Sequence, residues 1–159
     1  MSLQPLSEQA GYPSVVKLPY RDVRKFLEQI AWCVDHTATL IRAYAQLVKL
    51  APSEVEAEEV KTMMQQEKKQ FTLLESLYRE LMGGEPMARP EPHDFTTYED
   101  GLKYAVSLER VAIRHYRDTY LLTPSMKVRD IFFYALSDGT EHIVGLLMLQ
   151  LGKPHQTDI

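Results

Sequence analysis

The sequence of 159 residues predicts an all-α protein, an up-down four-helix bundle. Apolar residues recur every three or four positions through four long segments, which is the period of an amphipathic helix. Capping and helix-breaking residues separate these segments, and no segment alternates as a strand would. The connections run short, long, short. This order indicates two tandem helical hairpins joined by one long loop.

The first hairpin is expected from the helical period of residues 20–50. Pro52 ends that helix, because proline cannot continue a helix and disfavours helical geometry in the residue before it. Ser53 with Glu56 three positions later forms a capping box that starts a second helix. Gly83 and the glycine after it terminate the second helix.

The second hairpin follows a long connection. Residues 83–96 hold three prolines and two glycines and are expected to be irregular. Thr96 with Glu99 forms another capping box, so a third helix is expected to begin there. Pro124 breaks the chain again, and a fourth helix is expected to run to about Leu151.

An internal repeat supports the two-hairpin organisation. A shift of 72 residues aligns the halves without a gap, so that the Pro-Ser turn at 52–53 falls on the Pro-Ser turn at 124–125. The same shift pairs Thr37 with Glu109, Glu67 with Gly139, Gln70 with His142, and Tyr44 with Tyr116.

Composition excludes several classes of partner and site. The net charge of −4 argues against a non-specific nucleic-acid binder, which would carry a basic surplus. Cys33 is the single cysteine, which excludes an internal disulfide framework and a cysteine-rich zinc site. The longest apolar run, residues 143–149, is far shorter than the roughly 20 residues that span a bilayer. No membrane contact is therefore expected.

The chain divides into three parts at this stage. Residues 1–19 are expected to be an irregular N-terminal arm, residues 20–151 the bundle, and residues 152–159 a C-terminal tail. The arm lacks the charged-then-apolar pattern of a signal peptide, so the expected compartment is the cytoplasm.

Three ionisable residues interrupt stripes that should face the bundle interior. They are Glu67 on the second helix, Glu109 on the third and His142 on the fourth. Charged side chains are rarely buried unless they are paired or bind a metal. The pattern therefore indicates either a metal site or a buried hydrogen-bonded network.

The sequence resembles the ferritin-like superfamily, and most of all the short single-domain rubrerythrin-type proteins of bacteria. The third-helix pattern E-x-x-A-x-x-x-Y is intact from Glu109 to Tyr116, and the phrases LYRELMGGEP and YEDGLKYAVSLERVAIRHYRDTYL are similar to such proteins. The resemblance covers about residues 20–151. It implies a ferritin-like bundle whose di-iron or di-manganese centre takes one Glu from each of helices one and three and a Glu-x-x-His from each of helices two and four.

Half of the ligand set that the resemblance implies is missing. Thr37 stands at the position of the helix-one Glu, Gln70 at that of the helix-two His, and Gly139 at that of the helix-four Glu. The usual two-metal chemistry is therefore not expected, because the first of the two ions keeps no ligand of its own.

The other half of the implied ligand set is present. Glu67, Glu109 and His142 match ligand positions, and two carboxylates with one imidazole can hold a single Fe, Mn or Zn ion. Asp138 matches the family position whose carboxylate orients a ligand histidine without binding the metal itself.

Three functions remain open from the sequence. The first is a divergent ferritin-like protein without a cofactor, a non-catalytic binding or structural component; it is expected to be a homodimer, because the family commonly self-associates through helix faces. The second is a one-metal oxidoreductase acting on oxygen or peroxide, or a metal-handling protein. The third is a small-molecule carrier that uses the volume left by Gly139 and Thr37. No motif identifies a protein partner.

Overall fold

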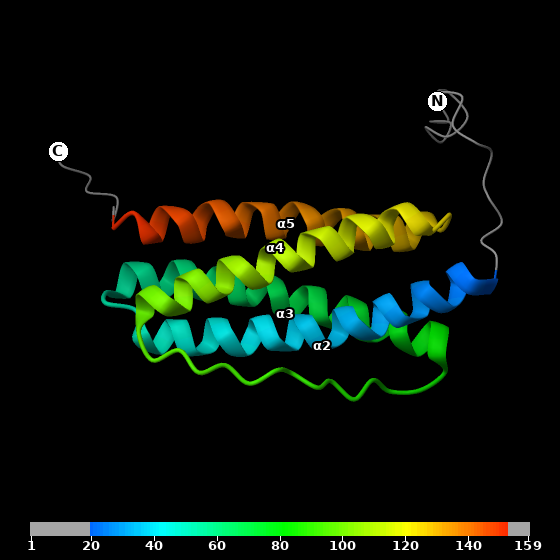
Figure 1. Ribbon diagram of the computed structural model, residues 1–159, viewed down its shortest axis with the longest axis horizontal. Helices are drawn as coiled ribbons and strands as arrows, with labels where there is room; N and C mark the ends of the chain where they lie inside the picture. The colour runs from blue at the N-terminus through cyan, green and yellow to red at the C-terminus, as the bar shows by residue number, and fades with distance from the viewer. Residues whose placement is uncertain (1–19, 153–159) are drawn as a thin grey trace, which may run out of the picture.

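A computed structural model describes residues 20–152 and shows an up-down bundle of four helices (Figure 1). Helix α2 (Tyr20–Leu50) and helix α3 (Glu54–Met82) form the first hairpin. Helix α4 (Tyr98–Leu122) and helix α5 (Met126–Gln150) form the second. Residues 20–152 contain no strand, so the all-α prediction is confirmed. The predicted arm and most of the predicted tail lie outside the described residues.

Each helix packs on two of the other three. Helix α2 contacts α3 and α4, and helix α5 contacts α4 and α3, whereas α2 and α5 lie diagonally across the bundle. The core between them is lined by fully buried large side chains, among them Ile30, Phe132 and Leu146. None of the four described helices has the length and apolar character needed to cross a membrane.

The predicted serine caps are present at the second helix of each hairpin. The Ser53 hydroxyl accepts a hydrogen bond from the backbone N–H of Glu56, and the Ser125 hydroxyl accepts one from Val128. These two serines are equivalent in the sequence repeat, so the repeat is also a repeat of structure. Gly83 ends α3 with a φ of 73°, a left-handed conformation that glycine adopts without steric cost.

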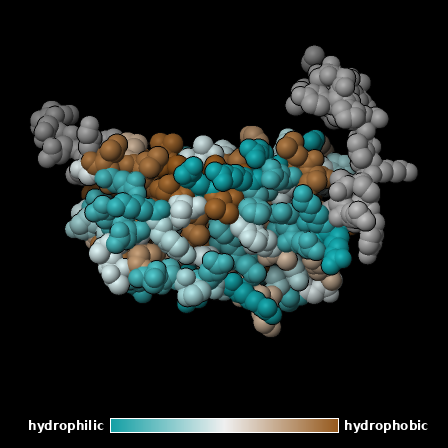
Figure 2. Space-filling view, in the orientation of Figure 1, coloured by the Kyte–Doolittle hydropathy of each residue, from teal (hydrophilic) through white to brown (hydrophobic). Residues whose placement is uncertain are grey.

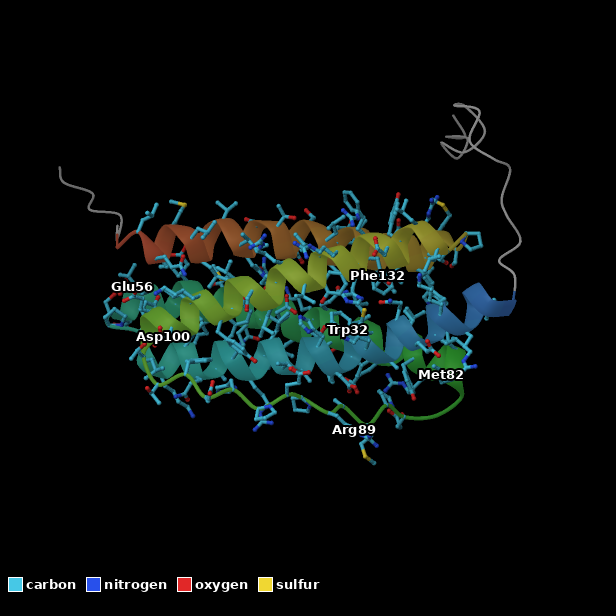
Figure 3. All side chains as sticks on the ribbon, in the orientation of Figure 1. Trp32, Glu56, Met82, Arg89, Asp100 and Phe132 are labelled. Carbon is cyan, nitrogen blue, oxygen red and sulfur yellow. The ribbon has the colours of Figure 1, made fainter. Side chains whose placement is uncertain are left out.

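The start of α4 was predicted one residue too early. Thr97, and not Thr96, is the N-cap, and its hydroxyl accepts from the backbone N–H of Asp100. Two adjacent threonines each have an acidic residue three positions later, so the capping-box pattern fits both. The acidic first turns of α3 and α4 meet at one end of the bundle, where Figure 3 labels Glu56 and Asp100.

The long connection lies along α2 (Figure 1). Two backbone N–H groups fix it there: that of Arg89 donates to Asp35 Oδ1 at 2.8 Å, and that of Glu91 donates to Thr39 Oγ1 at 2.9 Å. Figure 3 shows Arg89 on this loop, on the side of α2 that faces away from α5. The loop therefore covers an outer face of α2 and leaves the outer face of α5 uncovered by any described residue.

Two glycines of α5 allow its neighbours to approach closely. A Cβ atom at Gly139 would lie 2.8 Å from Ile113 Cγ2 and 3.1 Å from Glu109 Oε2, both on α4. A Cβ atom at Gly145 would lie 2.5 Å from the terminal methyl of Met63 on α3. The atoms near Gly139 belong to a branched side chain and to a carboxylate held by hydrogen bonds, so they cannot easily move. The Met63 methyl near Gly145 is the end of a flexible side chain and can move.

Gly139→Ala is expected to lower the free energy of unfolding by about 1–3 kcal/mol, because the added methyl group overpacks the contact between α4 and α5. Gly145→Ala is the matched control. There the Met63 methyl can move, and alanine favours a helix over glycine by up to about 1 kcal/mol, so little or no loss is expected. Urea unfolding of the two variants measures the difference, and equal losses would contradict the packing argument.

Candidate metal centre

Glu67, Glu109 and His142 converge in the core from helices α3, α4 and α5. Their exposed fractions are 4%, 0% and 2%. One ligand atom from each lies within 4.8 Å of the ligand atoms of the other two. Each residue occupies an inward position of its helix, so the period of the apolar stripes places all three in the core. The structure therefore brings together the three residues that the sequence singled out.

His142 has acceptor partners on both ring nitrogens. Its Nδ1 lies 2.9 Å from Glu109 Oε1 and 3.4 Å from Glu67 Oε1, and its Nε2 lies 2.7 Å from Gln66 Oε1. Burial by itself lowers the pKa of the imidazole, but the hydrogen bonds and charges of Glu109 and Glu67 outweigh it and raise that pKa to about 10. Without a metal, both ring nitrogens therefore donate and the ring is cationic.

Glu109 is held by two donors on one oxygen. Its Oε1 accepts from the Tyr44 hydroxyl at 2.5 Å and from His142. Burial, followed by the nearby charge of Glu109, raises the pKa of Tyr44 well above its usual value, so the hydroxyl stays protonated and donates. The other oxygen, Oε2, is buried without a hydrogen-bond partner.

The carboxylate charge of Glu67 is the least well balanced by neighbouring groups. Burial raises its pKa, the charge of Glu109 raises it further, and the contact with His142 opposes both; the result is a pKa of about 7. Its Oε2 has no partner, and neither has Nε2 of the nearby buried Gln70. Buried polar atoms without partners are rare, because each one costs about 1–3 kcal/mol. Two unpartnered carboxylate oxygens beside an imidazole thus fit a cation that the chain itself does not supply.

The positions that lost their ligand residues, Thr37, Gln70 and Gly139, are neutral. The Tyr116 hydroxyl lies 3.3 Å from Thr37 Oγ1, which is the repeat counterpart of the contact between Tyr44 and Glu109. The volume expected beside Gly139 is not there, because Ile113 and Glu109 fill it. For Gly139 the expectation was wrong, because side chains of α4 reach the backbone of α5 there.

Sequence reasoning missed Gln66. Asp138 is half-buried and makes no hydrogen bond to His142 among the described residues, whereas Gln66 holds the His142 Nε2. The available signal was helical spacing. Gln66 lies three positions after the buried Met63 and four before the buried Gln70, at the edge of the inward stripe.

Comparisons with known proteins identify the fold. A bacterioferritin-related protein of Bacteroides fragilis, described as a dodecameric thioferritin, matches with a TM-score of 0.72 and 19% identity over 82% of this chain and 86% of that one. A hypothetical protein of Pyrococcus furiosus matches with a TM-score of 0.70 and 17% identity over 84% of this chain and 94% of that one. No protein-family model and no curated protein matches the sequence. The chain has a ferritin-like fold.

The metal-free protein is expected to lose stability as the pH rises from about 4.5 to about 10. Glu67, with a folded pKa of about 7, and His142, with one of about 10, both bind protons more tightly in the folded than in the unfolded chain. The folded state therefore holds more protons across this range, and the free energy of unfolding falls as the pH rises. Denaturant unfolding in the presence of a chelator, at pH values from 5 to 10, measures the slope.

His142→Gln is expected to flatten the part of this slope above pH 7. His115→Gln is the control, because burial lowers the pKa of that partly exposed histidine and removes its titration from the alkaline range. An unchanged alkaline slope in His142→Gln would show that the imidazole is not the group that titrates there.

Proposed function

We propose that this ferritin-like chain is a non-catalytic metal-binding protein that holds one divalent ion, Fe, Mn or Zn, with Glu67, Glu109 and His142. One observation carries the proposal: two buried carboxylates and an imidazole converge within 4.8 Å, and each carboxylate keeps one unpartnered oxygen. Two carboxylate oxygens and one nitrogen are a common donor set for these three ions.

The contacts of His142 favour Nδ1 as the ligand atom. Nδ1 is the nitrogen that faces both carboxylates, whereas Nε2 faces Gln66 Oε1, which only accepts hydrogen bonds. Gln66 thus holds the proton on Nε2 and leaves Nδ1 as the nitrogen that can give up its proton. The negative charge of the two carboxylates then balances the charge of a divalent ion in a site with almost no exposure to water.

The neutral half of the core supports a binding role over catalysis. A bound ion would supply Lewis-acid or one-electron chemistry, but the residues equivalent to a second set of ligands are Thr37, Gln70 and Gly139, and none of them is ionisable. The filled space beside Gly139 also argues against a carrier of small molecules at this point. Neither an oxidase nor a peroxidase therefore fits this core as well as a one-ion binding protein.

A second candidate is a metal-free bundle in which the same three residues form a structural network. One observation favours it. The protonated His142 already donates to Glu109 and to Gln66, and Tyr44 donates to Glu109, so three of the network's contacts need no ion. In this role the network would orient α3, α4 and α5 without binding anything.

We also propose that the protein is cytoplasmic and forms a homodimer. The buried, free Cys33 fits a reducing compartment, in which thiols are not oxidised to disulfides. The Bacteroides fragilis thioferritin is described as a dodecamer, and this supports self-association of a chain with the same fold.

Metal content after incubation with excess iron(II), manganese or zinc, followed by desalting, is expected to be about one equivalent per chain. Glu67→Gln should reduce retained metal at least tenfold, because it removes a charged ligand. The control is Glu58→Gln, which neutralises an exposed carboxylate of the same helix. Two equivalents would contradict the ligand assignment, and no retained metal in the unchanged protein would favour the structural network.

Gln66→Leu is expected to weaken metal affinity about 10–100-fold while all three ligands stay in place, the usual cost of losing a group that orients a ligand histidine. Gln65→Leu, at the exposed neighbouring position, is the control. Competition with a chromophoric chelator measures the affinities. An affinity unchanged by Gln66→Leu would mean that the contact with His142 Nε2 does not orient the ring for metal binding.

A further inference from the structure

The outer face of α5 carries a row of uncharged residues at the spacing of a helix–helix contact. We call it the α5 seam; its members are Phe133, Ser137, Thr140, Val144, Leu147 and Leu151, and all are exposed, whereas the exposed Asp130, three positions before Phe133, ends the uncharged row. From Phe133 onward the steps are four, three, four, three and four residues, a 3.5-residue period typical of helices that pack along their length. Figure 2 shows apolar patches along the edge that α5 forms, with hydrophilic surface between them.

The seam is hollowed and no described part of the chain covers it. Its centre forms a depression of about 480 Å³, lined by residues of α5 alone, with Phe133 and Val144 among them. Helix α5 packs on α4 and α3 through its other faces, and the long loop lies along α2. A helix that is apolar on two faces is expected to be covered on both.

We propose that two copies of the chain associate through this seam, with α5 packed in parallel against α5 of the second copy. The proposal rests on the homodimer proposed above and adds its interface and orientation; it does not depend on metal binding. Three observations select a second copy as the occupant: the period of the seam, the area of apolar surface it offers, and the opposite charge of its two edges.

The area is that of a stable interface. Seven large apolar side chains of this face keep 43–74% of their surface exposed, namely Met126, Phe133, Tyr134, Val144, Leu147, Met148 and Leu151. At roughly 200 Å² for each fully exposed large side chain, they offer about 800 Å². A stable dimer of standard size buries about 800 Å² per partner. Single exposed apolar residues are ordinary on a protein surface, but apolar side chains clustered on one helix face, here on both sides of Ser137 and Thr140, mark an interaction site.

The edge of the seam toward α3 is acidic at its centre. Lys127 lies on that edge, because its Nζ is 2.6 Å from Glu80 of α3. Glu141 lies two heptads after Lys127 and hence on the same side of α5, where it is exposed. Glu59 of α3 also reaches this edge, with its Oε1 3.7 Å from the position of a Cβ atom at Gly145.

The edge toward α4 is basic at Arg110, whereas Arg117 is paired with Asp118. Ile113 of α4 faces α5 at Gly139, and the exposed Arg110 and Arg117 lie three positions before it and four after it, on the neighbouring outer surface of α4. Since Glu109 contacts His142, Arg110 lies at about the same height along the bundle as Glu141. One edge of the seam therefore presents arginine at the height at which the other presents glutamate.

The opposite charges of the two edges determine how the two copies are oriented. A two-fold axis along the helices places the α4 edge of each copy on the α3 edge of the other and sets Arg110 opposite Glu141 of the second chain. An antiparallel arrangement would place the α4 edges on each other and bring arginine to arginine, which costs free energy. The parallel arrangement is therefore favoured, and it is symmetric, as most dimers are.

Sedimentation and light scattering of the full-length protein test the association. We expect a dimer that Leu147→Glu and Thr140→Glu each weaken at least tenfold in Kd, because each buries a charge in the seam. Thr140→Glu removes no apolar packing, so it keeps the test valid if Leu147→Glu unfolds. The control is Val111→Glu. Val111 is 41% exposed, close to the 43% of Leu147, but lies on the side of α4 toward α2.

Disulfide cross-linking tests the orientation. In a Cys33→Ser background, Ser137→Cys and Leu151→Cys should each cross-link to the same residue of the second copy. Dimers that join Ser137→Cys only to Leu147→Cys would overturn the parallel arrangement. A monomer at all concentrations, or a dimer that neither seam variant weakens, would overturn the interface itself. Retained metal in the seam variants separates this result from the fate of the metal centre.

Discussion

The arrangement of this bundle depends on one electrostatic constraint, the neutralisation of two carboxylates in a core that excludes water. Glu109 and Glu67 are almost fully buried, and each carries a charge that burial penalises heavily. His142 of α5 and the Tyr44 hydroxyl of α2 donate hydrogen bonds to Glu109, and Gln66 of α3 accepts one from His142. All four helices therefore contribute a residue to this hydrogen-bonded network. The raised pKa of Glu67 shows that its charge is only partly compensated, whereas the raised pKa of His142 shows that the two carboxylates stabilise the charged imidazole.

The internal repeat shows why only one half of the core contains buried charges. The tyrosine of each hairpin reaches into the other: Tyr44 contacts Glu109, and Tyr116 contacts Thr37, the repeat counterpart of Glu109. A carboxylate at position 37 would need a cation beside it, yet the counterpart of His142 is the neutral Gln70. Both halves therefore keep the tyrosine contact, and only one keeps the charge. The two halves also differ in packing, since Gly139 admits Glu109 and Ile113 where its counterpart is the full-length Glu67.

Periodicity and local signals were enough to predict four helices, their turns and the three converging ionisable residues. Those features are local or follow from which face of a helix is apolar, and both can be read in the sequence. The choice between Thr96 and Thr97 could not be made, because it depends on the path of the preceding loop. Nor could the contact of Gln66 with His142 or the closure around Gly139, which depend on side-chain torsions and on the distance between helices that are far apart in the sequence.

Helix α5 has two faces with separate constraints. Its inner face presents His142 to the carboxylates, and Gly139 on that face lets α4 approach closely. Its outer face carries the apolar seam, which no described residue covers. The outer face of α2, at the opposite corner of the bundle, is covered by the long loop. A loop on α5 would have removed the need for a partner there. Because the loop lies on the diagonal helix instead, the helix that carries the only buried imidazole of residues 20–152 is also the one whose outer face favours a second chain. A second chain packed on the outer face of α5 would limit the motion of this helix. It would thereby help to hold the His142 ring against the two carboxylates.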